Sequence, residues 1–144
     1  MASGVTNKCL FLLAKKVIDF SADSFKIILM KSGFVFDRGT HHAYADVSAN
    51  ELSTGYGYTQ NTKTLSGVTV TEDDTNNRCS VTWSNVTWTA SGGSIGPTPG
   101  AIIFDDTVTT PIADPIVGYI DFGGEQTQAD GGVATISSIE VRLA

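Results

Sequence analysis

The chain has 144 residues, of which 41% are hydrophobic and 17% are charged, and its formal net charge is −6. This length suits one domain with its own core, and the composition is not that of a disordered chain. The acidic balance argues against a general nucleic-acid binder, because neutralising phosphates requires a surplus of Lys and Arg. The charge is unevenly spread, since residues 1–42 carry +3 and the rest of the chain carries −9. Either this asymmetry is an accident of a solvated surface, or the basic end docks on an acidic protein surface.

The N-terminal region combines a short apolar run with lysines. The run "CLFLLA" (9–14) is too short to cross a bilayer, and two lysines follow it without a convincing cleavage site, which argues against a signal peptide. We therefore expect no membrane partner and a chain that is made and used in solution. Helical spacing of apolar residues predicts a short helix over residues 7–15, with Thr6 or Asn7 as its cap.

These features divide the chain into an N-terminal arm with a short helix (1–16) and a single β domain (17–144). The arm is a candidate docking segment through its lysines, Lys8, Lys15 and Lys16. The alternative is that the apolar side chains of the same segment belong to the core of the domain, namely Leu10, Leu13 and Val17.

The middle of the chain alternates strands with polar excursions. Residues 25–32 predict a central strand that is apolar on both faces, with Phe25, Ile27 and Leu29 on one side and Ile28 and Met30 on the other. Residues 33–59 read as a long surface excursion. Within it, 46–52 could form one helical turn, because Ser48 and Glu51 have capping-box spacing. Residues 64–73 predict a strand with Val68 and Val70 facing inward.

The segment "CSVTWSNVTWTA" (79–90) changes its apolar phase at Ser84-Asn85, from odd to even positions. A continuous strand cannot bury both sets on one face, because its side chains alternate with a period of two. Two arrangements fit. Ser84-Asn85 could be a two-residue hairpin turn, or the chain could run on through a bulge or kink that resets the phase.

The rest of the sequence predicts strands over 101–106 and 116–122, with loops over 91–100 and 123–132 and a closing strand or strand pair over 133–143. Strands spaced about ten residues apart are typical of antiparallel all-β domains. The expected fold is therefore mainly β, a single-domain antiparallel β-sandwich or barrel, with a jelly roll among the arrangements, and with a short N-terminal helix.

The polar residues do not form a recognisable catalytic set. His41 and His42 are adjacent, so on an extended segment their side chains point in opposite directions and do not easily share a metal. The acidic pairs at 73–74 and 105–106 could hold calcium, but turns also attract Asp for backbone hydrogen bonds alone. The two cysteines, Cys9 and Cys79, show no partner pattern. We expect no enzyme activity, no metal and no cofactor.

Three tyrosines, Tyr44, Tyr56 and Tyr58, lie in the long polar excursion. They could form a sugar-binding platform or fill a subunit interface, or they could pack the loop onto the domain.

Five segments, in order, together resemble a family of small tailed-bacteriophage virion structural proteins, over most of residues 8–143. The segments are "IDFSADSFKIILM" (18–30), "THHAYADVSANEL" (40–52), "GYTQNTKTLSGVTVTEDDT" (57–75), "VTWTASGGSIGP" (86–97) and "IVGYIDFGGEQT" (116–127). In this family the segment similar to 86–97 follows a separate strand, which favours a break at Ser84-Asn85 between two strands. The stretch "PTPG" (97–100) departs from the family pattern, in which an aromatic or basic residue is expected.

The resemblance implies a structural protein of the virion, in the first place a decoration or cement protein on the capsid exterior. Its expected partner is the major capsid protein or another virion protein, and icosahedral symmetry suggests a homo-oligomer such as a trimer. A head–tail joining, tail or fibre-base component is the nearest alternative. A receptor- or carbohydrate-binding module that uses the tyrosine-rich loop is a second.

Overall fold

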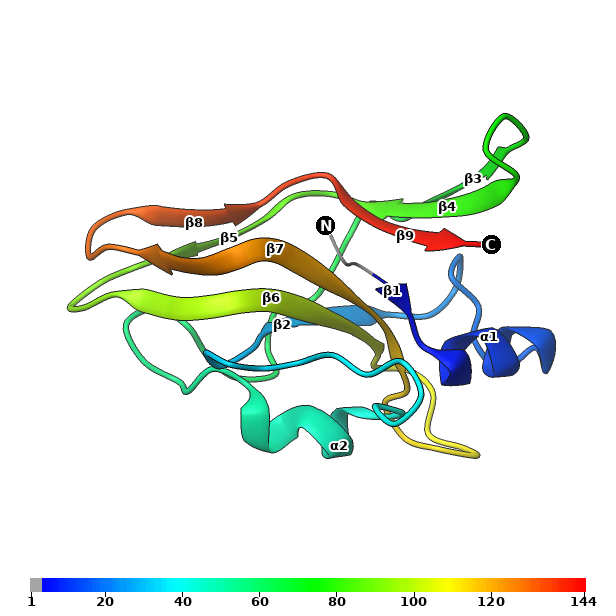
Figure 1. The fold of residues 1–144 in the computed structure, drawn as a ribbon, viewed down its shortest axis with the longest axis horizontal. Helices are drawn as coiled ribbons and strands as arrows, with labels where there is room; N and C mark the ends of the chain where they lie inside the picture. The colour runs from blue at the N-terminus through cyan, green and yellow to red at the C-terminus, as the bar shows by residue number, and fades with distance from the viewer. Residues whose placement is uncertain (1–3) are drawn as a thin grey trace.

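A computed structural model describes residues 4–144 as a mainly β domain of antiparallel sheets packed against each other (Figure 1). One sheet has the order β1-β7-β6-β2, and the opposite layer consists of β3-β4-β9 and β5-β8. The strands are β1 (Gly4–Val5), β2 (Phe25–Leu29), β3 (Thr69–Asp73), β4 (Arg78–Trp83), β5 (Val86–Thr89), β6 (Ile95–Asp105), β7 (Ile116–Gln128), β8 (Val133–Ile136) and β9 (Ile139–Leu143). The predicted fold class, including the single domain and the short N-terminal helix, is confirmed.

The four-stranded sheet is buried on both faces, as the sequence of β2 predicts. Its inner face meets the opposite layer in the main core, to which Ile27 and Leu29 contribute. Its outer face carries a second, smaller hydrophobic cluster, to which Ile28 and Met30 belong. The helix α2 (Tyr44–Val47), followed by a 3₁₀ turn (Ser48–Asn50), covers this outer face (Figure 1). The domain therefore has three layers.

The predicted N-terminal helix is present as α1 (Asn7–Ala14). Thr6 caps it, since its hydroxyl accepts a hydrogen bond from Cys9 N at 3.0 Å and donates one to Ile116 O at 2.6 Å. Cys9 and Leu12 are buried in the main core, and Val5 pairs with Gly118 of β7. Both cysteines are free, and no helix among residues 4–144 is long and apolar enough to span a membrane.

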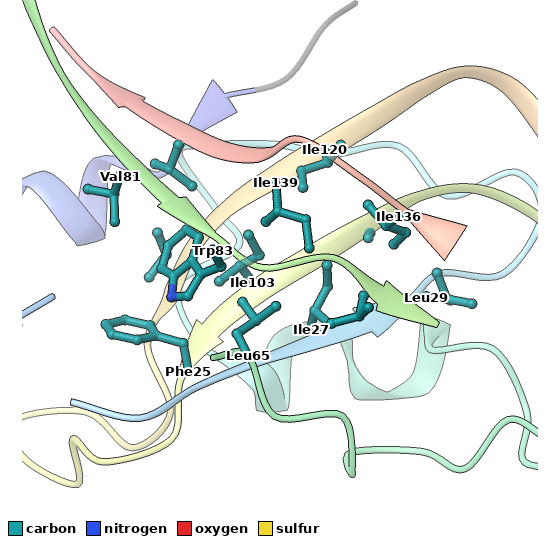
Figure 2. Packing of buried hydrophobic residues seen from close by; sticks show 14 of the residues in the cluster. Phe25, Ile27, Leu29, Leu65, Val81, Trp83, Ile103, Ile120, Ile136 and Ile139 are labelled. Atoms are coloured by element: carbon teal, nitrogen blue, oxygen red, sulfur yellow. The ribbon is translucent and has the colours of Figure 1, made fainter. Parts of the chain in front are cut away.

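The segment 79–90 forms two successive strands, β4 and β5, with a break at Ser84-Asn85, so the predicted break is confirmed and the hairpin alternative is wrong. β4 pairs with β9 through Trp83 and Ile139, and β5 pairs with β8 through Val86 and Ile136. The register is therefore uninterrupted, and Ser84-Asn85 lies opposite residues 137–138. Both strands of this ribbon change phase at the same point. Figure 2 shows that Trp83, Ile136 and Ile139 consequently all point into one core.

Three details of the sequence prediction are wrong. Val70 faces the same side as its partner Val81 but is 46% exposed, because β3 projects beyond the opposite sheet (Figure 1). The predicted loops 91–100 and 123–132 are largely strand, since Ile95 pairs with Gln128. Register shifts in this part of the β6–β7 pair accommodate the glycines and prolines that the sequence presents as loop signals.

The third detail is the capping box. Asp46 caps the start of α2, because its carboxylate accepts hydrogen bonds from the backbone of His42 and Ala43 at 2.9 and 3.0 Å. Ser48 and Glu51 therefore do not act as a box, and Glu51 is instead fully buried.

Candidate functional site

The outer side of α1 and the residues at its C-terminal end are the candidate functional site. We call it the α1 surface: Lys8 and Phe11 on the helix, Lys15 at its C-cap and Lys16 just beyond it. Phe11 is 53% exposed, although it lies in the middle of an apolar run. Lys8 Nζ lies 5.7 Å from the centre of the Phe11 ring, and Lys15 follows Phe11 by one helical turn. An aromatic side chain with a basic surround is thus presented to solvent.

The opposite side of the same helix is core. Cys9 and Leu12 are buried, and the three apolar residues of the alternative reading are partly buried against the main core: Leu10, Leu13 and Val17. The core reading therefore holds for the inner side of this segment, and the docking reading stays a prediction for its outer side. In addition, Asn7 N donates a hydrogen bond to Arg38 O at 3.0 Å, which ties the start of α1 to a neighbouring loop. The helix holds its outer surface in a fixed place.

None of the three lysines forms an ion pair within the described part of the chain, where the ion pairs involve Lys26, Arg78 and Arg142. The positive charge of the α1 surface is thus not neutralised locally. A cationic rim around an exposed aromatic ring is complementary to an acidic protein surface that has an apolar hollow. This arrangement is suited to binding such a partner.

The three tyrosines of the polar excursion do not form one platform. Tyr58 is only 2% exposed, and its hydroxyl donates to Glu51 Oε1 at 2.8 Å and accepts from Leu29 N at 3.0 Å. Tyr44 donates to Glu51 Oε2 at 2.6 Å and stacks on Phe104. Only Tyr56 is exposed, at 57%. Tyr58 is therefore a core residue and not an interface aromatic, because its hydroxyl satisfies a buried carboxylate.

Glu51 is the buried acceptor that organises this loop. Besides the two tyrosine hydroxyls, it accepts a hydrogen bond from Asn61 N at 2.8 Å. Burial and the neighbouring carboxylate both raise the pKa of the Tyr58 hydroxyl. Sequence reasoning missed this role, since Glu51 looked like a helix-capping residue. Its one signal was the presence of two tyrosines seven residues away on either side.

The histidines and paired aspartates are dispersed. His41 stacks on Phe34, and His42 Nε2 contacts Gly39 O at 2.7 Å. Asp73 pairs with Arg78 across the β3–β4 turn at 3.1 Å. Asp105 is buried, whereas its neighbour Asp106 reaches Lys26 at 3.3 Å. Within residues 4–144 no group of three or more His, Cys, Asp or Glu side chains is placed to hold a metal ion.

Asp105 forms a second buried polar site, which the sequence analysis missed. Its Oδ1 accepts hydrogen bonds from Thr107 N and Val108 N at 2.9 and 3.2 Å. Its Oδ2 is buried without a donor among the described residues, and the neighbouring group is the carboxylate of Asp23. Desolvation, and the hydrogen bond that a protonated Asp105 can donate to Asp23, raise the pKa of Asp105 to about 7. The available signal was an Asp at the end of an apolar strand.

Cys9 lies close enough to Asp105 to experience its charge. Burial, and secondarily this negative charge, raise the pKa of the Cys9 thiol to about 12. The thiol therefore stays protonated at neutral pH and is a poor nucleophile. Burial thus raises the pKa values of both groups at this site.

Comparisons of the chain with protein-family models, with curated proteins and with solved structures find no match, so the resemblance to tailed-phage virion proteins rests on the quoted segments alone.

Proposed function

We propose that this chain is a non-enzymatic structural protein of a tailed-phage virion, foremost a decoration or cement protein that binds the exterior of the head and stabilises the shell. The resemblance of five ordered segments supports the class of protein. The observation that carries the mode of action is the α1 surface, where Phe11 is exposed between Lys8 and Lys15.

The mechanism of such a protein is mechanical. Phe11 would insert into an apolar hollow of the major capsid protein, and the lysines would lie against its acidic residues. Because α1 is capped by Thr6 and packed by Leu12, little conformational entropy would be lost when the helix docks. Each bound copy that bridges neighbouring capsid subunits adds its binding free energy to the assembled shell, so occupancy follows concentration and affinity.

The first test is the copy number of this chain in purified virions, measured by quantitative mass spectrometry against the major capsid protein. A large and simple ratio is expected for a shell decoration protein. A trace amount would indicate instead that the protein is a component of the connector, the tail or the fibre base. Its absence from virions would overturn the structural role.

The second test is binding of variants to shells that lack the protein. Phe11→Ala is expected to weaken binding about thirtyfold, because truncation of a central aromatic anchor typically costs about 2 kcal/mol. Val133→Ala is the matched control, since Val133 is 53% exposed, as Phe11 is, and lies in β8 at the other end of the domain from α1 (Figure 1). Equal binding of both variants and the unaltered protein would exclude the α1 surface.

Point substitutions are needed because deletion cannot separate docking from folding. Removing residues 1–16 would take Val5 out of the sheet and Cys9 and Leu12 out of the core. Loss of binding by such a deletion would then report unfolding. Phe11 lies outside the core cluster, so its truncation is expected to leave the fold intact, which circular dichroism checks.

The receptor- or carbohydrate-binding alternative depends on the tyrosine loop. Burial of Tyr58 leaves Tyr56 as the exposed aromatic of that loop. Glycan-array binding that is lost in Tyr56→Ala would favour this function over the capsid role.

A further inference from the structure

The sheet β3-β4-β9 ends in a free strand edge at β9. This strand pairs with β4 on one side and has no strand partner on its other side among residues 4–144. By contrast, the outer edge of β2 in the opposite sheet is covered, through backbone hydrogen bonds with Leu52, Lys63 and Leu65. A free edge presents unpaired N–H and C=O groups, with which another extended chain can pair.

A cleft of about 310 Å³ lies beside β9 and separates it from β1 and β7. Glu140, Val141 and Arg142 line it on one side, and Gly4 and Tyr119 line it on the other. The two layers therefore do not close against each other along this strand, and the cleft leaves room for the side chains of an added strand.

The sequence of β9, Ile-Glu-Val-Arg-Leu, is complementary to itself in the antiparallel direction. When two copies of β9 pair about Val141, Glu140 of each copy lies directly opposite Arg142 of the other, and Ile139 lies opposite Leu143. Directly opposite side chains share one face of an antiparallel pair and contact each other. The charged pairs fall on the outer face, because Ile139 and Val141 point into the main core.

Glu140 and Arg142 form an ion pair within one chain, and the Arg142 side chain is 61% exposed, so it is accessible to a second strand. In the paired arrangement each charge has an opposite charge beside it on its own strand and another across the interface. A neutral strand would provide no charge at these positions, and a strand with charges of one sign would repel either Glu140 or Arg142. The two charges therefore favour a second copy over an unrelated strand.

The other free edges of this layer lack such complementarity. In β3, pairing of two copies about Thr71 places Val70 opposite Glu72, and pairing about Glu72 places two carboxylates opposite each other. β8 carries no charge, and the left-handed backbone of Ser138, with a φ of 54°, interrupts the edge between β8 and β9. The observations thus single out β9.

We propose that two copies of this chain associate through their β9 edges into a dimer, in which one continuous sheet of order β3-β4-β9-β9-β4-β3 runs through both copies. The dimer has two-fold symmetry, because the same strand pairs with itself in the antiparallel direction. It differs in symmetry from the trimer that an icosahedral shell suggests. The interface is separate from the α1 surface, and the proposal does not depend on the docking role.

Sedimentation velocity of the full chain between about 5 and about 500 µM tests the association, because weak dimers dissociate within this range. We expect the dimer fraction to rise with concentration and no larger species to form. Arg142→Glu should weaken dimerisation about thirtyfold, since two attractive contacts become two repulsive ones. Arg38→Glu is the matched control, because it reverses the charge of an exposed arginine outside β9 and should leave dimerisation unchanged.

Mixing of variants separates contacts between copies from effects within one copy. Glu140→Arg should dimerise as weakly as Arg142→Glu, because arginines then lie opposite each other. An equimolar mixture of these two variants should dimerise about as tightly as the unaltered protein, since every Glu again faces an Arg. Circular dichroism checks that each variant is folded. A chain that stays monomeric throughout, a trimer, undiminished dimerisation of Arg142→Glu, or a mixture no tighter than its components would overturn the proposal.

Discussion

The Asp105 carboxyl makes the stability of this domain depend on pH. In the unfolded chain it titrates near its ordinary value of 3.8, whereas in the folded protein its pKa is raised to about 7 by burial and by Asp23. The folded state therefore binds the proton more tightly. This group stabilises the fold fully below pH 4, loses its contribution as pH rises towards 7, and contributes nothing above that.

Asp105→Asn should remove this dependence. The amide oxygen can still accept from Thr107 N and Val108 N, and the amide N–H can donate to Asp23. We expect the Tm of the variant to exceed that of the unaltered protein by about 5 °C at pH 8, and the difference to vanish towards pH 4. Thermal unfolding by circular dichroism between these pH values measures it.

Asp106→Asn is the matched control, because Asp106 is next in sequence but exposed and paired with Lys26 at 3.3 Å. Its Tm should follow that of the unaltered protein across the pH range. Parallel curves for Asp105→Asn and the unaltered protein would show that Asp105 is ionised in the fold at neutral pH.

The ribbon of β4–β5 with β8–β9 is the element that joins the two ends of the core. Its apolar residues fall at odd positions in β4 and at even positions in β5. The phase change between the two strands allows Trp83 and Trp88 both to lie on the buried side. The change needs an irregular backbone on both strands. Ser138 supplies it on one of them, with a φ of 54°, which is in the left-handed region.

Ser138→Val should be destabilising for this reason. A β-branched side chain is strongly disfavoured in the left-handed region, and we expect a loss of about 2 kcal/mol in the free energy of unfolding. Ser137→Val, at the exposed neighbour whose φ is negative, should change stability by less than about 0.5 kcal/mol. Urea unfolding compares them. Equal effects of the two substitutions would show that the strain does not lie at Ser138.

Strand existence could be predicted from the sequence, but strand extent could not. Continuous apolar runs identified β2 and the buried parts of β6 and β7. The outer parts of β6 and β7 contain Pro97, Pro99 and several glycines, so local signals indicated loops, whereas pairing along the hairpin keeps them extended. The inward assignment of Val70 was wrong because exposure depends on how far the opposite sheet reaches, which no local pattern records.

The candidate site could likewise be predicted only in part. Helical spacing predicted the helix, which the structure confirms, but of the three lysines only Lys8 lies within α1, since Lys15 is its C-cap and Lys16 follows its end. The run "CLFLLA" is apolar nearly all round, so the sequence could not indicate that Leu12 is buried while Phe11 is exposed. For Tyr58 the sequence left open a binding or interface surface and packing of the loop onto the domain, because its contact with the buried Glu51 is an interaction that only the folded loop creates.

At the scale of the whole molecule, the charge distribution bears on how the protein would dock. The α1 surface belongs to the basic N-terminal part of an acidic chain. A protein with a net charge of −6 would be repelled by an acidic shell unless a basic region faced it. Orientation of the bound protein would thus follow from the position of α1.

Binding to shells should therefore weaken with ionic strength. Raising NaCl from about 50 mM to about 500 mM is expected to reduce affinity about tenfold or more, because salt screens exposed charges. Phe11→Ala should lower affinity at every salt concentration without changing the slope. Lys15→Glu combined with Lys16→Glu should flatten or reverse the slope, while Lys31→Glu, an exposed lysine outside the α1 surface, should leave it unchanged. Cosedimentation of each variant with shells measures all four. An affinity that is independent of salt would assign the contact to an uncharged face of the domain, and the lysines of α1 would then have no part in docking.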